Sequence, residues 1–301
     1  MSTKLKAKPP SEVKPGHCKG IIFGQSGVGK TWFALSFPKP YYIDTEGGSK
    51  LAHYTAKLQA AGGAYLGQTE GACDYETILS QIQALATEKH QYKTLIIDSI
   101  TKVFISTVAK ESERLGEKDV YGASKKPATG YMRRLANWVD KLDMNVWFVA
   151  HETAEWMNVG GQRQEVGRMP DVWDKLVYDL DLTLRIERLG KGRRSATVYK
   201  TRLQGFPDGD RFPIQEEGND VGYEQFVARY GKDFIEAEAV PVVLATPEQV
   251  AEIDRLIKVI NVSDGEVEKL LSKAGVESFN ELPTERAAAA IGYFINKVKA
   301  N

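Results

Sequence analysis

Short apolar runs alternate with segments of helical periodicity through the first half of the chain. The runs show no polar alternation, which is typical of strands buried on both faces of a sheet. The four runs are residues 18–23, 41–44, 94–99 and 145–150. The segments with apolar residues at helical spacing are 76–89, 100–115 and 128–142. Strands and helices in this order predict an α/β fold with a mostly parallel sheet.

The pattern changes near residue 180. Residues 181–187 and 195–202 alternate between apolar and polar positions, and the turn sequence GKGRR lies between them at 190–194. Two alternating segments joined by a short turn predict an antiparallel hairpin at the edge of the parallel sheet. We interpret the basic turn residues Arg193 and Arg194 as solvent-exposed.

The C-terminal part of the sequence predicts a separate helical unit. Thr, Pro and Gln of TPEQ at 246–249 occupy the positions that a helix N-terminus prefers, and SDGE at 263–266 repeats the capping pattern. A third helix is expected at 284–299, and Pro241 interrupts a small apolar linker before the unit. We divide the chain into a flexible basic arm, a core, a linker and a helical module, at 1–16, 17–236, 237–245 and 246–301.

Composition and charge exclude several classes of protein. The 301 residues contain 40 Lys and Arg and 40 Asp and Glu, so the chain is neither a polybasic histone-like protein nor a mostly disordered acidic one. Two cysteines, Cys18 and Cys73, exclude a disulfide scaffold and a four-cysteine zinc site. No run approaches the ~18 apolar residues of a membrane span, and the N-terminus lacks the apolar region of a secretory signal. We therefore expect a cytoplasmic protein without a membrane partner.

One motif carries the chemistry. The sequence GQSGVGKT at 24–31 fits the phosphate-binding P-loop, and it follows a predicted strand and opens a predicted helix. Its backbone N–H groups are expected to face the phosphates of a nucleotide, Lys30 to bridge the β- and γ-phosphates, and Thr31 to hold Mg²⁺. The nucleotide-binding residues predicted from the motif are Gly24, Gln25, Ser26, Gly27, Val28, Gly29, Lys30 and Thr31.

Polar residues at the ends of three predicted strands complete a candidate site. Asp98 is the expected second metal ligand, although an Asp in this place also serves as a strand cap. Glu46 is the candidate for orienting the attacking water, with Asp44 as a competitor that we expect to cap its strand. His151 is expected to contact the γ-phosphate, unless it is a satisfied histidine at the end of a strand.

Taken together, these residues resemble the RecA-like ATPase core. That core has an Ile-Asp-x-Glu strand, here 43–46, and an apolar strand that ends in Asp-Ser, here 98–99. It also has a polar sensor, usually Gln, in the place of His151, and a late basic pair that Lys200 and Arg202 match. More narrowly, the chain resembles short phage RecA-like single-strand annealing recombinases, several of which end in a module that opens with Thr-Pro-Glu-Gln. The resemblance implies ATP and Mg²⁺ as ligands and an oligomer in which Lys200 and Arg202 reach a neighbouring subunit's ATP.

The same resemblance implies that two segments contact single-stranded DNA. The first is 118–134, where cations lie close to an aromatic residue, as phosphate contact with base stacking requires; the alternative is a solvated loop and helix face. Its candidate residues are Tyr121, Lys125, Lys126, Arg133 and Arg134. The second is 152–171, which carries Trp156, Arg163 and Arg168 and which we expect to be a mobile loop.

The expected function is that of a Mg²⁺-dependent ATPase that binds single-stranded DNA in phage-type recombination or strand annealing, working as an oligomer. A RecA-like helicase or translocase shares every nucleotide motif and is the first alternative. The second alternative is an ATP-dependent switch or loader. Residues 246–301 carry no basic face, and their apolar stripes are expected to form their own core. We therefore expect this module to dock a single-strand-binding or replication protein rather than to contact DNA.

Overall fold

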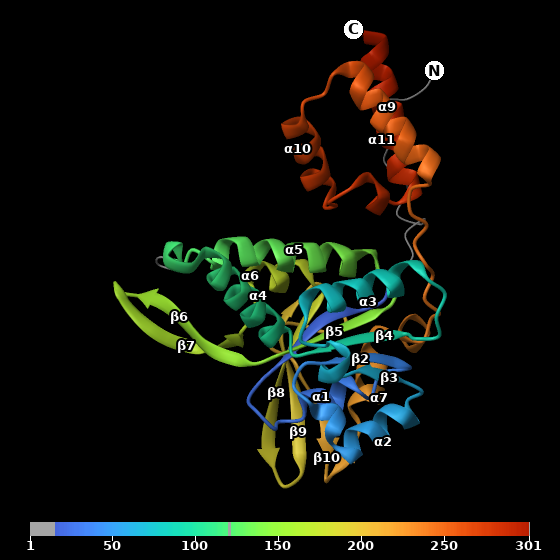
Figure 1. The fold of residues 1–301 in the computed structure, drawn as a ribbon. Coiled ribbons are helices and arrows are strands. Elements are labelled where there is room, and N and C mark those ends of the chain that lie inside the picture. The colour runs from blue at the N-terminus through green and yellow to red at the C-terminus, as the bar shows by residue number, and fades with distance from the viewer. Residues whose placement is uncertain (1–15, 120–121, 301) are drawn as a thin grey trace.

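The structure is a computed structural model, and it describes residues 16–119 and 122–300 (Figure 1). Two of the sequence predictions, the basic arm before Gly16 and the candidate base-stacking residue Tyr121, lie outside the described residues.

A nine-stranded sheet forms the centre of the molecule (Figure 1). In order across the sheet, its strands are β11 (Asn219–Asp220), β10 (Arg211–Glu216), β9 (Arg193–Thr201), β8 (Leu182–Gly190), β1 (Lys19–Phe23), β5 (Asn145–Ala150), β4 (Thr94–Asp98), β2 (Pro40–Asp44) and β3 (Ala64–Leu66). Neighbours from β8 to β3 pair in parallel, whereas β8 to β11 pair antiparallel. The predicted α/β fold with a mostly parallel sheet and an antiparallel edge is confirmed.

The predicted hairpin is present, but it is not the outermost part of the sheet. Strand β8 pairs in parallel with β1, so the hairpin belongs to the parallel sheet through its first strand. Strands β10 and β11 then extend the sheet beyond β9. The sequence concealed β10 because it contains Pro213, and a proline argues against a strand that is paired on both sides.

Two layers of helices cover the sheet (Figure 1). One face carries α3 (Tyr75–Thr87), α4 (Ile100–Leu115), α5 (Lys125–Lys141) and α6 (Asp174–Asp179). The other carries α1 (Lys30–Ala34), α2 (Ala52–Ala60), α7 (Gly222–Tyr230) and α8 (Lys232–Ile235). Short 3₁₀ turns connect these elements at η2 (Gly48–Lys50), η3 (Gln68–Glu70) and η4 (Gly116–Lys118).

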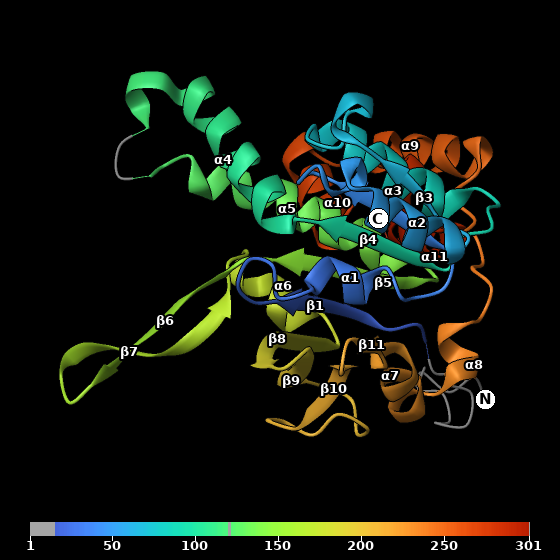
Figure 2. The same ribbon diagram turned by 90° about the horizontal axis from the view of Figure 1, so that it is seen from below.

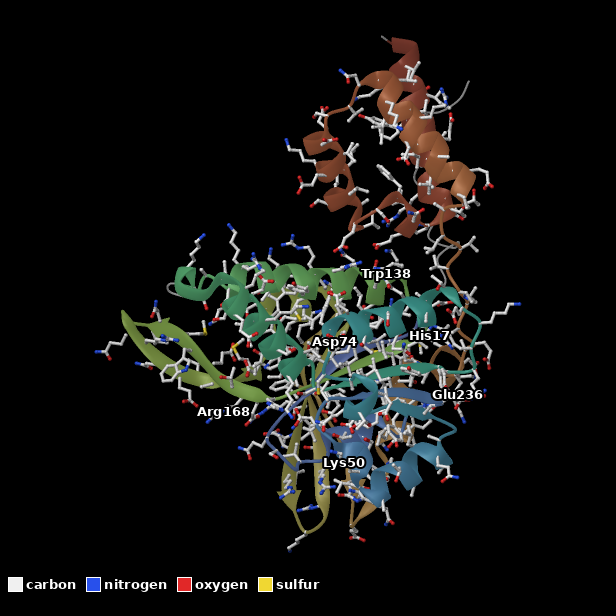
Figure 3. All side chains as sticks on the ribbon, in the orientation of Figure 1. His17, Lys50, Asp74, Trp138, Arg168 and Glu236 are labelled. Atoms are coloured by element: carbon white, nitrogen blue, oxygen red, sulfur yellow. The ribbon has the colours of Figure 1, made fainter. Side chains whose placement is uncertain are left out.

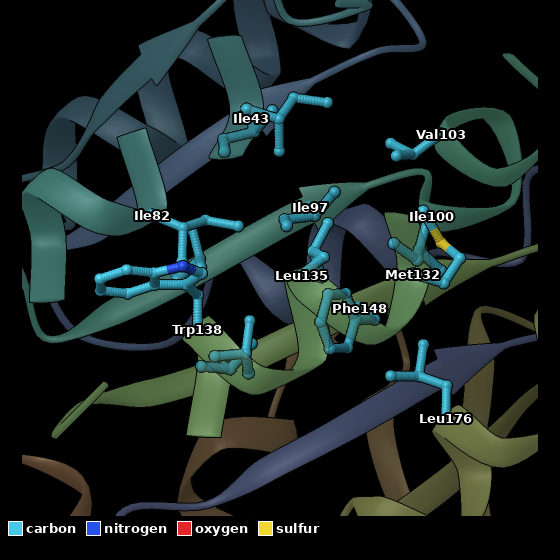
Figure 4. Packing of buried hydrophobic residues seen from close by; sticks show 14 of the residues in the cluster. Ile43, Ile82, Ile97, Ile100, Val103, Met132, Leu135, Trp138, Phe148 and Leu176 are labelled. Carbon is cyan, nitrogen blue, oxygen red and sulfur yellow. The ribbon is translucent and has the colours of Figure 1, made fainter. Parts of the chain in front are cut away.

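The two layers are built from alternate residues of the same strands. Phe148 of β5 packs into the cluster under α3, α4 and α5, whereas its neighbour Trp147 packs into the cluster on the opposite face. Figure 4 shows the first cluster, in which Phe148 lies among side chains such as Ile97 and Leu135. Both faces are fully apolar because successive side chains of a strand point to opposite sides, which explains the continuous apolar runs in the sequence.

Residues 152–170 form a two-stranded antiparallel ribbon, so the prediction of a mobile loop is wrong. Strand β6 (Glu152–Val159) pairs with β7 (Gln162–Pro170), and the turn is Gly160–Gly161, with φ values of 60° and 83°. Two glycines at positive φ give the tight turn that matches the twist of a hairpin. The ribbon projects from the core on the same side as the far ends of α4 and α5 (Figures 1 and 2).

The C-terminal helices form an apolar cluster of their own. They are α9 (Pro247–Ile260), α10 (Asp264–Ala274) and α11 (Thr284–Ala300), with the 3₁₀ turn η5 (Phe279–Glu281) before the last. The predicted capping boxes at Thr246 and Ser263 are confirmed, and Gly275 ends α10 in the left-handed conformation. Across the part of the chain that the structure describes, no helix is both long and apolar enough to cross a membrane.

Candidate active site

The P-loop joins β1 to α1. Gly24, Gly27 and Gly29 have φ values of 147°, 72° and 100°, a conformation that side chains rarely adopt. At Gly24 a Cβ atom would also lie 2.5 Å from the carbonyl oxygen of Ile186. Helix α1 is only five residues long, shorter than the motif predicts, and Phe33 anchors it against Trp147 in the core. With so short a helix, the loop's own N–H groups carry most of the expected phosphate binding.

The Lys30 side chain folds back over the P-loop. Its Nζ donates to the carbonyl oxygens of Gly24 and Gln25, each at 2.8 Å. Burial lowers the pKa of Lys30, and the carboxylates of Asp98, Glu152 and Glu46 act in the opposite direction. The ammonium group is therefore held at the rim of the loop by neutral acceptors, which phosphate oxygens can replace.

Thr31 and Asp98 meet at the position expected for a metal ion. The Thr31 hydroxyl donates to Asp98 Oδ2 at 2.5 Å, and Asp98 is only 4% exposed. Burial raises the pKa of Asp98 to about 6, although the hydrogen bond from Thr31 acts to lower it. The groups around Asp98 therefore do not fully stabilise its negative charge. Hydroxyl and carboxylate oxygens are the ligands that Mg²⁺ prefers, and it usually takes only one or two carboxylates from a protein. The pair fits Mg²⁺ held jointly with phosphate oxygens, and the described residues contain no larger cluster of metal-ligating side chains.

Glu46 is fixed by three side chains at the carboxyl end of β2. Its Oε1 accepts from Ser99 Oγ at 2.6 Å and lies 3.1 Å from Nε2 of His151, and its Oε2 lies 3.0 Å from Nζ of Lys102. Burial acts to raise the pKa of Glu46, but the hydrogen bonds from Ser99 and Lys102 and the charge of Lys102 outweigh it and hold the pKa below its usual value. The carboxylate thus stays ionised and accepts hydrogen bonds in a defined direction.

Asp44 has a different role from Glu46. Its carboxylate accepts backbone hydrogen bonds from Glu46, Gly47, Gly48 and Ser49, at distances of 2.6–3.1 Å. It is fully buried at the end of β2. Asp44 therefore shapes the loop that presents Glu46, as expected for a capping residue.

These side chains surround one cavity of about 770 Å³, a size typical of small-molecule sites. Two of the eight residues predicted from the motif do not line it: Val28 is buried in the core beneath the loop, and Gly29 lies against Arg194. The sequence prediction missed several lining residues because they lie outside any motif. The complete lining is Gly24, Gln25, Ser26, Gly27, Lys30, Thr31, Tyr42, Glu46, Gly47, Gly48, Leu51, Tyr54, Asp98, His151, Glu152 and Arg168.

Two arginines of the β8–β9 hairpin lie against the P-loop. Arg188 donates to the carbonyl oxygen of Gly27. Arg194 packs beside Gly29 and donates to Oε1 of Gln215 at 2.6 Å. The interpretation of Arg194 as an exposed turn residue is therefore wrong, whereas Arg193 is exposed as expected. The side chain of Arg194 turns toward the loop because it faces the opposite side of the strand from Arg193.

The late basic pair lies outside this cavity. Lys200 lies near the end of β9 and Arg202 directly after it, and both donate to backbone carbonyls at the end of α6. Arg202 is exposed, and Lys200 is half-buried. Within one chain, the pair therefore caps α6 and does not line the nucleotide cavity.

The candidate DNA residues lie mostly on a helix, and one of them is occupied. Lys125, Lys126 and Arg133 are exposed on α5, which begins at Lys125, three residues before the helix predicted at 128–142. Most of the candidate segment 118–134 is therefore helical. Arg134 instead pairs with Glu277 at 2.8 Å and Glu281 at 3.3 Å. Arg134 thereby links α5 to the segment between α10 and α11. It is therefore not one of the candidate DNA-binding cations of this surface.

Comparison with protein families adds one finding to this geometry. The family model described as AAA domain matches residues 17–212, which include the P-loop and the strands β1 to β9. Comparison with curated proteins gave no match.

Proposed function

The chain belongs to the AAA domain family, a class of P-loop ATPase-type domain, and on this basis we propose that it hydrolyses ATP in the cavity at the carboxyl ends of β1, β2, β4 and β5. One observation carries the proposal: Lys30, the Thr31–Asp98 pair and an ionised Glu46 all line the same cavity. These are the parts that phosphoryl transfer to water needs, namely phosphate ligands, a metal site and a group that orients the water.

The proposed reaction is an in-line attack of water on the γ-phosphorus. Glu46 accepts a hydrogen bond from the water and aims its oxygen at the phosphorus. The bond from phosphorus to the bridging oxygen breaks, its electron pair stays with ADP, and both protons of the water leave on the released phosphate as dihydrogen phosphate. Lys30 and the loop N–H groups stabilise the charge on the phosphate oxygens. The Thr31 hydroxyl and the Asp98 carboxylate would hold Mg²⁺, which would supply further neutralisation of the phosphate charge.

We further propose that the domain is RecA-like and acts on single-stranded DNA in phage-type recombination or annealing. The order of strand-end residues Glu46, Asp98 and His151 supports the first part. Exposed Lys125, Lys126 and Arg133 on α5 support the second, because a row of cations on a projecting helix suits a phosphate backbone.

Removing two of these cations tests DNA binding. We expect single-stranded DNA to stimulate ATP hydrolysis by the wild type and to lose most of this effect in Lys125→Ala/Lys126→Ala. The slope of log affinity against log salt should become shallower by about 1.4, since single strands contribute about 0.7 per phosphate contact. The measurement is DNA affinity at several salt concentrations. The double variant Lys269→Ala/Lys273→Ala, which removes two exposed lysines of α10, is the matched control.

A turnover rate that ignores DNA would instead favour the switch or loader, with residues 246–301 docking a single-strand-binding or replication protein. Directional unwinding of a duplex would favour the helicase or translocase. Both alternatives keep the same nucleotide cavity, so neither changes the proposed chemistry.

We also propose an oligomer in which Lys200 and Arg202 reach the ATP of a neighbouring subunit. Their placement at the C-terminal end of β9 supports this, since both donate to backbone carbonyls that another partner can replace. Lys200→Ala is then expected to lower the ATP turnover number about tenfold, the effect of one charge-assisted hydrogen bond. Its affinity for ATP as a dilute monomer should stay unchanged. Equal loss of turnover and monomer affinity would contradict a contribution from the neighbour, and exposed Lys232→Ala is the control.

A further inference from the structure

One wall of the nucleotide cavity carries a cation that belongs to no motif. Arg168 of β7 lines the same cavity as Lys30, Glu46 and His151. It lies where the β6–β7 ribbon joins the core (Figure 3). Its side chain is 43% exposed, and its Nη2 pairs with Oε1 of Glu165 on the same strand at 3.1 Å.

The charges around this wall leave Arg168 available for an anion. Glu152, the first residue of β6, also lines the cavity, and its side chain is only 8% exposed. Arg185 of β8 pairs with Glu152 at 3.4 Å, so the negative charge of Glu152 already has a partner. The pair of Arg168 with Glu165 is exposed on both sides, and such surface pairs contribute little and exchange readily. A phosphate oxygen can therefore displace Glu165.

The wall that holds Arg168 is at the hydrolytic end of the cavity. His151 directly precedes the ribbon and contacts Glu46. Asp171, which directly follows the ribbon, donates its backbone N–H to the carbonyl oxygen of His151 at 2.9 Å. Strand β6 thus begins, and β7 ends, beside the group that orients the water. The planar fork of a guanidinium matches the oxygens of a terminal phosphate.

We propose that Arg168 binds the γ-phosphate of ATP within the same chain and thereby couples the position of the β6–β7 ribbon to the presence of that phosphate. The inference rests on the proposed function and adds to it a residue that distinguishes ATP from ADP. The ribbon has a surface that can transmit the difference, because Trp156 is 48% exposed and the Arg163 guanidinium lies 5.4 Å from its ring. A partner bound there would sense whether the terminal phosphate is in place.

The test compares two nucleotides in three variants. Affinities for a non-hydrolysable ATP analogue and for ADP are measured with Mg²⁺ in the wild type, Arg168→Ala, Arg168→Lys and the control Arg255→Ala, which removes an exposed arginine of α9. Arg168→Ala should bind the analogue about tenfold more weakly, as expected for one charge-assisted contact. It should bind ADP as the wild type does, Arg168→Lys should recover part of the loss, and Arg255→Ala should match the wild type.

Hydrogen exchange supplies a readout of the ribbon itself. In the wild type, the analogue should slow the exchange of backbone amides at 152–170 more than ADP does, and in Arg168→Ala the two nucleotides should give the same exchange. If the ratio of the two affinities is unchanged in Arg168→Ala, the assignment of Arg168 to the γ-phosphate is overturned, whereas the proposed ATP hydrolysis is not. A wild type that binds neither nucleotide would overturn the proposed function and this inference with it.

Discussion

Replacing Lys30 by alanine is expected to lower the rate of ATP hydrolysis about 1,000-fold, because the site loses the ammonium group that binds the phosphates. In the structure, the Lys30 ammonium is held over the loop by two carbonyl oxygens at 2.8 Å. It is therefore positioned before nucleotide arrives and needs to exchange only neutral partners for phosphate oxygens. Phosphate release at saturating ATP and Mg²⁺ measures the effect, and ATP affinity should fall with it.

The control for Lys30 removes a lysine of the same size from the surface. Lys89 follows α3 and is exposed, and Lys89→Ala should hydrolyse ATP as the wild type does. A Lys30→Ala protein that retains more than about a tenth of the wild-type rate would show that another group provides the main phosphate contact, a result that the geometry of this loop contradicts.

Replacing Glu46 by glutamine is expected to separate binding from hydrolysis. The amide keeps the size of the side chain but loses the negative charge that accepts from water, so the turnover number should fall about 1,000-fold. Because Lys30, Thr31 and the loop are unchanged, the affinity for ATP should stay within about twofold of the wild type. Single-turnover hydrolysis and equilibrium binding, measured on the same preparation, test both parts.

Two outcomes would contradict this role of Glu46. Wild-type turnover in Glu46→Gln would mean that another group orients the water. Loss of ATP binding would mean that Glu46 maintains the shape of the cavity through Ser99, His151 and Lys102 rather than acting on water. The control is Glu113→Gln, an exposed glutamate of α4 with the same chemical change.

The central sheet could be predicted because its strands are buried on both faces. Continuous apolar runs such as 94–99 and 145–150 arise where neighbouring side chains pack into opposite layers, and the two runs match β4 and β5 to within a residue. The ribbon could not be predicted in the same way. Its residues are mostly exposed on both faces, so β6 and β7 carry no periodic apolar signal, and only Gly160–Gly161 marks the turn.

The convergence of the site could be predicted because it follows from topology. Asp98 ends its strand, Glu46 and His151 follow theirs within two residues, and the P-loop after β1 leads to Lys30. The carboxyl ends of parallel strands meet at one edge of the sheet, so these residues converge there. Lys102, Arg168 and Arg194 could not be found by this rule. They reach the site from a helix, a ribbon and an antiparallel hairpin, and their positions depend on packing that no local pattern records.

The α5 cations show a second limit of local patterns. In the sequence, Arg133 and Arg134 are equivalent neighbours in one basic segment. On the helix they point in different directions, and Arg134 meets Glu277 and Glu281 from a part of the chain more than 140 residues away. Charge runs therefore predict that a surface is basic more reliably than they predict which of its cations are free.

The most direct test of the central claim is single-turnover hydrolysis of ATP by the wild-type protein, with enzyme in excess and with Mg²⁺ either present or chelated. If the cavity around Lys30, Glu46 and the Thr31–Asp98 pair is an ATP-hydrolysing site, bound ATP is converted fully to ADP and phosphate with Mg²⁺ and stays intact without it. ATP that binds with Mg²⁺ and is not hydrolysed, or hydrolysis that proceeds equally after chelation, would contradict the account.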